Sequence, residues 1–286
     1  MSIEQREKNK VNGGTLYLVA TPIGNLGDLS ERAVKVLSEV DFVAAEDTRN
    51  SMRLLTHLGI SKPMISYFEH NKRERGEQIV RRLLDGESCA LVTDAGTPAI
   101  SDPGEDIVAL CAETGVPVSS IPGPCAAIVA LTLSALPTGR FCFEGFLPAE
   151  KQERRTHLER LAGEDRTMIF HEAPHKLKNT LDDMAASFGA DRRISLCREL
   201  TKINEEAHRT TLGEAIAYYD NNAPRGEYVL VVEGRPENTA AVDWSGTDIA
   251  AHVESYIASG MSKKDAIKAV ARDRGVHKSV IYKELL

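Results

Sequence analysis

The feature that most constrains the fold of this chain is an alternation of short apolar runs with amphipathic helical stretches, which begins at Gly14. Glycine, proline or aspartate bounds each apolar run. The stretches between the runs have helical spacing, as in ERAVKVLSEV after Ser30, a favourable N-cap residue. The apolar runs predict strands at 15–21, 41–45, 64–68, 89–93 and 118–121. This alternation is typical of βα units around a mainly parallel sheet.

A segment rich in turn residues, LSALPTG at 133–139, separates these units from a second series. The second series predicts strands near 141–146, 167–170, 193–197 and 227–233. A chain of 286 residues has room for about two domains. The sequence therefore predicts an α/β protein with a cleft between two α/β domains, in the following order: a disordered N-terminal tail at 1–13, the domains at 14–134 and 135–236, and a linker with a basic helical subdomain at 237–286.

The C-terminal segment is polar after Gly234 and has a helical pattern from about Asp248. Ser262 and Asp265 form an S-x-x-D capping box at the start of one helix, and Gly275 offers a turn before the next. Apolar residues fall on one face of each helix: Ile267, Val270 and Ala271 on the first, and Val280, Ile281 and Leu285 on the second. Helix, glycine turn and helix together have the outline of a helix-turn-helix.

Positive charge is concentrated in this segment. The whole chain has a net charge of -7, whereas residues 261–286 contain seven Lys/Arg against three Asp/Glu, a net of +4, so the rest carries -11. A basic patch on one element is where an RNA contact is expected first. The predicted RNA-binding residues are Lys263, Lys264, Lys268, Arg272, Arg274 and Lys278. The alternative is a helical subdomain that packs against the body or mediates dimerisation.

Several classes of protein and site are disfavoured. No apolar run approaches the roughly 20 residues that span a membrane, and the polar N-terminus lacks a signal-peptide core, so we expect a cytoplasmic protein. The cysteines are odd in number and form no C-x-x-C pair, which argues against disulfides and a cysteine zinc site. HEAPH at 171–175 matches the H-E-x-x-H zinc signature, but Pro174 would interrupt the required helix. We therefore predict a loop there, with Pro174 near a helix start, and no metal.

Three loops that follow predicted strands contain small residues suited to a ligand. TDAGTPAISDPG at 93–104 has Asp94 and Gly96 directly after a buried strand. VATPIGNLGD at 19–28 is neither G-x-G-x-x-G nor a P-loop, and IPGPCA at 121–126 leads into a helix. Each could be only a tight turn. Because ligands bind beyond the carboxyl ends of parallel strands, three such loops predict one shared pocket.

Two charged clusters also follow strands. Glu46, Asp47 and Arg49 in AAEDTR could position a substrate or accept a proton, or could be a capped helix start with a local ion pair. The charged residues of CRELTK at 197–202 are most often a solvated rim, and they could line a cleft.

Taken together and in this order, VATPIGNLGD, AAEDTR, TDAGTPAISDPG, IPGPCA, FHEAPHKL and CRELTK resemble the signature series of the tetrapyrrole-methylase, or class III, methyltransferases. The resemblance is closest to the branch that 2′-O-methylates a ribose in small-subunit ribosomal RNA, and it covers about residues 14–233. The chain departs from the tetrapyrrole enzymes in having TPIGN where they usually carry a G-x-G-P-G loop, and Cys125 where serine is common.

The resemblance implies S-adenosylmethionine in the cleft, a homodimer, and as substrate the 2′-hydroxyl of a decoding-region cytidine in 16S rRNA, within the 30S subunit. By position, the cofactor would contact Asp94, Ala95, Gly96, Ala99 and Ile100, together with Pro22, Cys125, Ala126, Phe170 and Leu200.

The catalytic base stays open among Glu46, Asp47, Asp94 and Glu199. Our hypothesis is that Glu46 or Asp47 contacts the acceptor ribose and that Arg49 contacts a phosphate. Two other functions share these features: a methyltransferase acting on a tetrapyrrole-like small molecule or on diphthine, and a non-catalytic RNA-binding protein.

Overall fold

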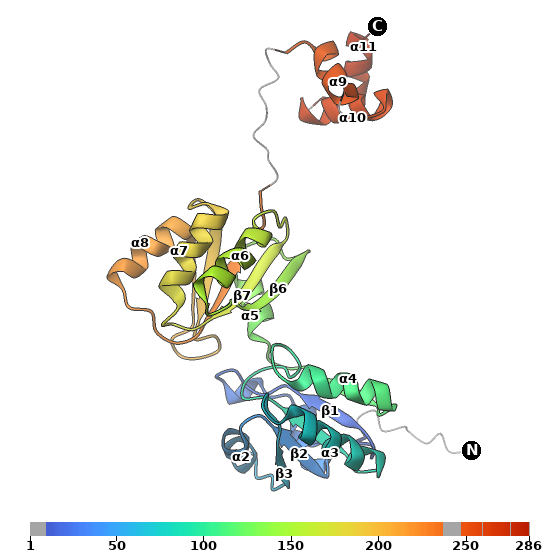
Figure 1. Ribbon diagram of the computed structural model, residues 1–286, viewed down its shortest axis with the longest axis vertical. Coiled ribbons are helices and arrows are strands. Elements are labelled where there is room, and N and C mark those ends of the chain that lie inside the picture. The colour runs from blue at the N-terminus through green and yellow to red at the C-terminus, as the bar shows by residue number, and fades with distance from the viewer. Residues whose placement is uncertain (1–9, 237–246, 259, 275, 286) are drawn as a thin grey trace, which may run out of the picture. The chain divides into compact units, whose positions relative to one another are not determined.

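The computed structural model describes residues 10–236, 247–258, 260–274 and 276–285, apart from the side chain of Arg272. These residues form two compact units, 1–235 and 236–286 (Figure 1). Most of the predicted N-terminal tail and of the predicted linker lies outside the described residues. None of the helices within the described ranges is long and apolar enough to cross a membrane.

The first sheet contains all five strands predicted for the first half of the chain. In the order β3-β2-β4-β1-β5, all parallel, the sheet consists of β3 Met64–Ser66, β2 Phe42–Ala45, β4 Cys89–Val92, β1 Leu16–Val19 and β5 Val118–Ile121. The helices that follow its strands are α1 Glu31–Glu39, α2 Thr48–His57, α3 Lys72–Leu84 and α4 Gly104–Thr114, with a 3₁₀ turn, η1, at Leu26–Asp28. Strands β1, β2 and β4 are buried along their whole length, as expected for a parallel sheet covered on both faces.

The second sheet has one strand more than predicted, and its strand directions are mixed. Its order is β6-β7-β10-β8-β9, from β6 Phe141–Phe146, β7 Thr167–Glu172, β10 Tyr228–Val232, β8 Arg193–Arg198 and β9 Glu206–Thr211. Only β6 and β7 are parallel, and the other pairs are antiparallel. The parallel pairing predicted for the first series therefore does not extend to this sheet. Strand β9, sequence EAHRTT, was missed because it is polar and half-buried at the edge of the sheet.

Helix α5, Ala126–Leu133, connects the two sheets. Its residues Ala127 and Ala130 pack in one apolar cluster with Ile169, Cys197 and Val231 of the second sheet. Helices α6 Lys151–Leu161, α7 Leu177–Phe188 and α8 Leu212–Asn221 supply the cluster on the opposite face. The predicted domain boundary at 134/135 stays a prediction. Helix α5 precedes this boundary in the sequence but is covered by the second sheet.

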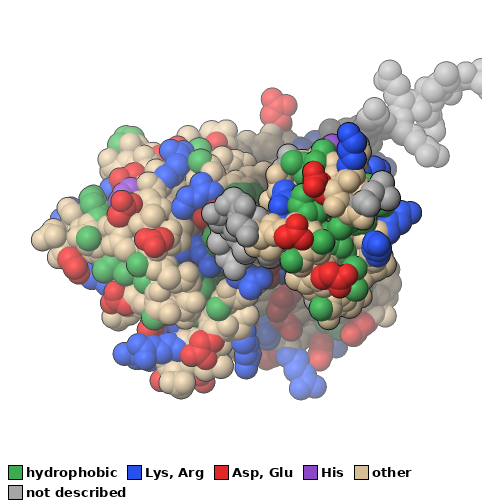
Figure 2. All heavy atoms as spheres, turned by 90° about the horizontal axis from the view of Figure 1, so that it is seen from above, with side chains coloured by type: hydrophobic (Ala, Val, Ile, Leu, Met, Phe, Trp, Pro, Cys, Tyr) green, Lys and Arg blue, Asp and Glu red, His purple; other side chains and the backbone are tan. Residues whose placement is uncertain are grey.

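The C-terminal unit contains three helices, α9 Ile249–Ala258, α10 Lys263–Asp273 and α11 Lys278–Glu284. The Ser262 side chain accepts a hydrogen bond from the Asp265 N–H at 3.2 Å, as the capping box predicts. The expected apolar face of α10 is buried, whereas on α11 Ile281 is buried and Val280 is exposed. The predicted turn residue Gly275 lies outside the described residues. On the face of the molecule in Figure 2, basic and acidic side chains are interspersed.

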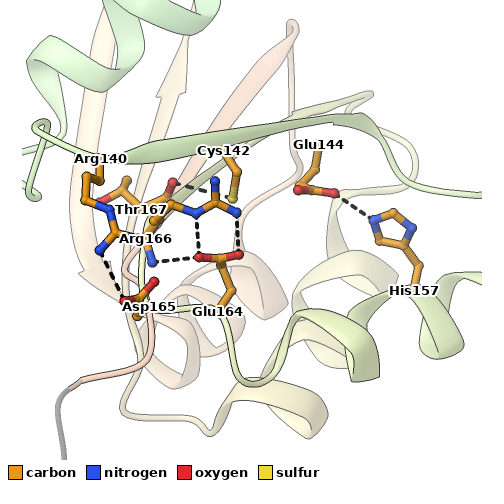
Figure 3. A network of polar contacts seen from close by, with 8 residues as sticks. All are labelled: Arg140, Cys142, Glu144, His157, Glu164, Asp165, Arg166 and Thr167. Carbon is orange, nitrogen blue, oxygen red and sulfur yellow. Dashed lines mark hydrogen bonds and ion pairs between the residues drawn. The ribbon is translucent and has the colours of Figure 1, made fainter.

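A polar network supports the edge of the second sheet where β7 begins (Figure 3). Glu164 accepts two hydrogen bonds from the Arg166 guanidinium, at 2.7 Å each, and these bonds lower the pKa of Glu164 to about 2. Arg140 pairs with Asp165 beside it. Burial raises the pKa of the neighbouring Cys142 thiol to about 11. The network lies at the opposite end of β7 from the loops described below, so we assign it a structural role.

Helices α6 and α7 are joined by a buried ion pair. The Asp183 carboxylate, only 4% exposed, lies 2.7 Å from the Arg154 guanidinium, which is itself 9% exposed, and 2.8 Å from Arg155, which is half-exposed. A buried charge that loses its partner is costly, because neither water nor an opposite charge then compensates it.

We therefore expect Asp183→Ala to destabilise the protein by about 3–5 kcal/mol, since it leaves Arg154 buried without a counter-charge. Arg155→Ala is the matched control and should cost about 1 kcal/mol or less, because its side chain is largely hydrated. Urea unfolding of both variants tests this. Equal destabilisation by the two variants would contradict the assignment of Arg154–Asp183 as the stabilising pair.

Candidate functional site

The three glycine- and proline-containing loops of the first sheet are hydrogen-bonded to one another. The Thr21 N–H donates to the Gly96 carbonyl at 2.9 Å, and the Gly96 N–H donates to the Thr21 carbonyl at 3.1 Å. The Thr97 hydroxyl donates to the Pro124 carbonyl at 2.9 Å. Loops 20–28, 93–104 and 121–125 therefore lie side by side, as the sequence predicted.

Two loops beside this bridge hold their backbone in an uncommon conformation. Ala99 and Ser101 have φ of 65° and 61°, and Glu199 and Thr201, after β8, have φ of 51° and 67°. The Asp102 carboxylate stabilises the first loop by accepting hydrogen bonds from the N–H groups of Ala99, Ile100 and Gly104, at 2.7–3.3 Å. Positive φ at non-glycine residues costs about 1–3 kcal/mol each and clusters at binding sites. Both loops thus have a feature typical of functional loops.

A cavity of about 290 Å³, here called the cleft pocket, lies between these loops and the second sheet. This volume is near the lower end for ligand cavities, roughly 300 Å³. The cleft pocket is lined by Ile23, Ala95, Ala126, Phe146, His171, Glu172, Ala173, Cys197, Glu199, Leu200, Lys202, Glu227, Tyr228 and Val229. Both sheets thus contribute to it, which is the arrangement expected of a cleft.

A second cavity of about 300 Å³, here called the α2 pocket, lies beside helix α2. It is lined by Thr21, Pro22, Leu26, Asn50, Ser51, Arg53, Leu54, His57, Thr93 and Asp94.

The ten predicted cofactor residues fall into five groups. Ala95, Ala126 and Leu200 line the cleft pocket, and Pro22 and Asp94 line the α2 pocket. Gly96, Ala99 and Ile100 belong to the bridged loop, where Gly96 forms the bridge itself. Cys125 is the N-cap residue of α5 and packs in the same apolar cluster as Ala126. Phe170 is placed elsewhere.

Phe170 is 1% exposed and packs in the core on the other face of the second sheet. Successive side chains of a strand point to opposite faces, so Phe170 faces α6–α8 while Ile169 and His171 face α5 and the cleft pocket. Only the backbone of Phe170 could therefore reach a ligand there.

His171 is a candidate site residue that the sequence did not single out for ligand binding. Its ring lies edge-on to the rings of Phe143 and Phe146, at centroid distances of 5.2 and 5.3 Å. Its Nε2 atom is buried and has no hydrogen-bond partner among the described residues. Desolvation lowers the pKa of His171, which favours the neutral imidazole. Because successive side chains of a strand point to opposite faces, the strand position of FHEA could have placed His171 on the face opposite Phe170.

HEAPH does not form the helix that a zinc site of this type requires. His171 is in β7, residues 173–176 form a turn, and α7 begins at Leu177, so Pro174 lies near a helix start as predicted. Within the described ranges, no group of three or more His, Cys, Asp or Glu side chains could hold a metal ion.

In the AAEDTR cluster, Asp47 caps helix α2. Its carboxylate accepts hydrogen bonds from the Arg49 backbone N–H at 2.8 Å and from the Arg49 guanidinium at 3.1 and 2.8 Å. These bonds lower the pKa of Asp47 to about 2. Glu46 instead accepts a hydrogen bond from the Thr93 hydroxyl at 2.9 Å. The capped helix start and the local ion pair are both present, and the Arg49 side chain stays 85% exposed.

In the CRELTK loop, Arg198 pairs with Glu206 and Lys202 pairs with Glu199 at 3.0 Å. Glu199 and Lys202 line the cleft pocket, but Arg198 does not.

The predicted RNA-binding side chains differ in availability. Lys263, Lys264 and Lys278 are exposed, and Lys268 is exposed and pairs with Asp265 at 2.9 Å. Arg274 is part-buried and donates hydrogen bonds within the unit to His252 Nδ1 and the Thr247 carbonyl. The side chain of Arg272 lies outside the described part of the chain.

Comparisons with known proteins give a consistent family. The model of the family "Tetrapyrrole (Corrin/Porphyrin) Methylases" matches residues 15–216. Three similar proteins are each named ribosomal RNA small subunit methyltransferase I. The one from Halalkalibacterium halodurans is 48% identical over 99% of this chain and 98% of its own. The one from Bacillus subtilis is 45% identical over 96% and 94%, and the one from Escherichia coli O157:H7 is 41% identical over 99% of each.

Solved structures show the same fold at low identity. A diphthine synthase has a TM-score of 0.58 at 14% identity and covers 77% of this chain and 90% of its own. Cobalt precorrin-4 methyltransferase has a TM-score of 0.56 at 16% identity and covers 77% and 95%.

Proposed function

Because this chain belongs to the tetrapyrrole methylase family of S-adenosylmethionine-dependent methyltransferases, we propose that it methylates the ribose 2′-hydroxyl of a cytidine in the decoding region of 16S rRNA. The observation that carries the proposal is the extent of the similarity to proteins named for the small-subunit RNA, which reaches 99% of the chain at up to 48% identity. The fold alone cannot distinguish an RNA methylase from a small-molecule methylase.

The cleft pocket supports cofactor binding by the chemistry of its lining. Ile23, Leu200 and Val229 provide apolar walls for a nucleoside, and the Glu227 carboxylate favours a ligand with positive charge, whereas Glu199 is already paired with Lys202. The buried Nε2 of His171 offers an unused hydrogen-bonding group. These residues fit S-adenosylmethionine, which would supply a methyl group already activated on a sulfonium. The chain must then align the acceptor hydroxyl and exclude water.

The structure favours Glu46 over Asp47 as the group that accepts the hydroxyl proton. A base of low pKa is inefficient, and Arg49 holds the pKa of Asp47 at about 2. Glu46 is half-buried and receives one hydrogen bond, from Thr93, which orients its carboxylate. We therefore propose that Glu46 faces the acceptor ribose and that Asp47 positions Arg49 toward a phosphate.

The resemblance further implies a homodimer that acts on the assembled 30S subunit in the cytoplasm. Three of the exposed lysines of the C-terminal unit, Lys263, Lys264 and Lys278, support an additional RNA contact through phosphates.

The function is tested by incubating the protein with radiolabelled S-adenosylmethionine and, separately, naked 16S RNA, 30S subunits and a small-molecule extract. We expect label on a single 2′-O-methylcytidine after nuclease digestion, and the comparison of the two RNA samples identifies the substrate form. Label confined to the small-molecule extract would establish the small-molecule alternative. Cofactor binding without any turnover would favour a non-catalytic RNA-binding protein.

We expect Glu46→Gln to lower kcat by about 10²-fold, because it removes a proton acceptor while keeping the side-chain shape. Arg49→Ala should instead raise the KM for RNA by about tenfold, as expected for a lost phosphate contact. Asp47→Asn should leave the shape of the pH–rate profile between about pH 5 and 9 unchanged, since a group of pKa about 2 is fully ionised there. Steady-state kinetics over RNA concentrations that span KM separate the effects on kcat and KM, and the same measurements over a pH series give the profile. Unchanged turnover in every variant would remove this assignment.

Replacing Lys263, Lys264 and Lys278 by alanine should weaken RNA binding and reduce the slope of log affinity against log salt by about 2–3, one unit for each lost phosphate contact. Filter binding over a salt series measures the slope, and deletion of 237–286 is the full-removal control. If the deletion variant is still dimeric and binds RNA with unchanged affinity, the C-terminal unit has a structural role instead.

A further inference from the structure

The α2 pocket combines apolar walls with polar side chains that the fold does not use. Pro22, Leu26 and Leu54 form the apolar part, and Leu26 is 50% exposed although it is a large aliphatic residue. Asn25 caps η1 by accepting a hydrogen bond from the Gly27 N–H at 2.9 Å, and this turn holds Leu26 in place. A cavity of about 300 Å³ with such walls suits a planar heteroaromatic ring.

The polar lining of the pocket includes Asn50, Arg53, His57 and Asp94. None of these four side chains makes a hydrogen bond or ion pair with another residue in the part of the chain that the structure describes. The nearby carboxylates of Glu46 and Asp47, by contrast, are both hydrogen-bonded within the protein. The pocket therefore presents donors and an acceptor that are available to a ligand.

The α2 pocket and the cleft pocket take neighbouring residues from the same two loops. Pro22 lines the α2 pocket and Ile23 lines the cleft pocket. Asp94 likewise lines the α2 pocket, and Ala95 lines the cleft pocket. The Thr21–Gly96 bridge lies next to both pairs and fixes the two loops together. Two ligands held in these cavities would thus meet at one pair of loops, as a methyl donor and a methyl acceptor must.

The charge of helix α2 indicates which kind of acceptor the pocket suits. Arg49, Arg53 and His57 recur every four residues and therefore share one face of the helix. Arg53 and His57 line the pocket, and the exposed Arg49 precedes them by one turn. Two arginines and a histidine donor beside a ring-sized cavity favour a nucleotide with its flanking phosphates over a neutral or cationic small molecule.

We infer that the α2 pocket receives the acceptor nucleotide. Its base lies inside the pocket, and its ribose lies at the border between the two pockets, beside Pro22–Ile23 and Asp94–Ala95. This inference rests on the proposed function and deepens it. A nucleotide in folded RNA can be presented in this way when it is turned out of its stack. The Asp94 carboxylate accepts a hydrogen bond from the exocyclic amine of cytosine, and Asn50 or Arg53 donates to the ring nitrogen or carbonyl. Uracil has a carbonyl in place of that amine, so it is disfavoured beside Asp94.

Steady-state kinetics with Arg53→Ala and Asn50→Ala test the pocket. Each variant should lower kcat/KM for RNA by about tenfold, the effect of one lost base or phosphate contact, with the dissociation constant for S-adenosylmethionine unchanged. The matched control is Arg73→Ala, which removes a 95% exposed arginine of α3 that does not line the α2 pocket. If both variants have the same kcat/KM for RNA as Arg73→Ala, the inference is overturned.

Photo-cross-linking gives a readout that is independent of turnover. The full chain is irradiated with 16S RNA that carries 5-iodocytidine, both free and reconstituted into 30S subunits, and the cross-linked peptides are mapped. We expect cross-links within residues 21–26, 50–57 or 93–94, the segments that contain the lining residues of the pocket. Cross-links confined to other segments, or none at all, would overturn the pocket.

The two experiments separate the pocket from the reaction. If the wild-type chain cross-links in the α2 pocket but transfers no methyl group to RNA, the proposed reaction fails and the pocket is supported. If the wild type methylates RNA while both pocket variants behave as Arg73→Ala does, the reaction stands and the pocket is wrong.

Discussion

The pair of backbone hydrogen bonds between Thr21 and Gly96 is the constraint on which the rest of the site depends. Each bond contributes only about 1 kcal/mol to stability. Their position matters more than their strength, because they join the loops that follow β1 and β4, two neighbouring strands of the first sheet. The Thr97–Pro124 bond extends the connection to the start of α5, and α5 packs on the second sheet. The loops that line the two cavities are thus joined largely through backbone groups rather than through the lining side chains.

The first sheet could be predicted from the sequence because its central strands are buried on both faces. Such strands read as continuous apolar runs, as CALV does in β4. The second sheet was harder to predict, since an edge strand such as β9 buries too little to leave an apolar run. The placement of α5 could not be predicted at all, because AAIVALTL is apolar around its whole circumference and its pattern does not indicate which sheet it contacts.

The sequence predicted those parts of the site that are formed by short continuous segments. The loops after β1, β4 and β5 carry small residues in recognisable order, and they lie together. Phe170 and His171 show the limit of that reasoning, because adjacent strand residues face opposite sides and only the sheet assignment decides which one reaches the cleft pocket. The α2 pocket depends on side chains from a helix and from two distant loops. Its residues are ordinary surface types, so no sequence pattern marks them before the chain folds.

The composite lining of the cleft pocket has a consequence for the lifetime of the protein. Both sheets contribute residues to that cavity, so a ligand bound there holds the two halves of the 1–235 unit together. Any compound that binds only the folded state stabilises it by mass action, by about 2.7 kcal/mol at a concentration of 100 times its dissociation constant. The fraction of this protein that is open to unfolding and proteolysis would then vary inversely with the supply of the compound. With the methyl donor proposed above as that compound, a cell short of it would contain an enzyme that is both less active and less resistant to proteolysis.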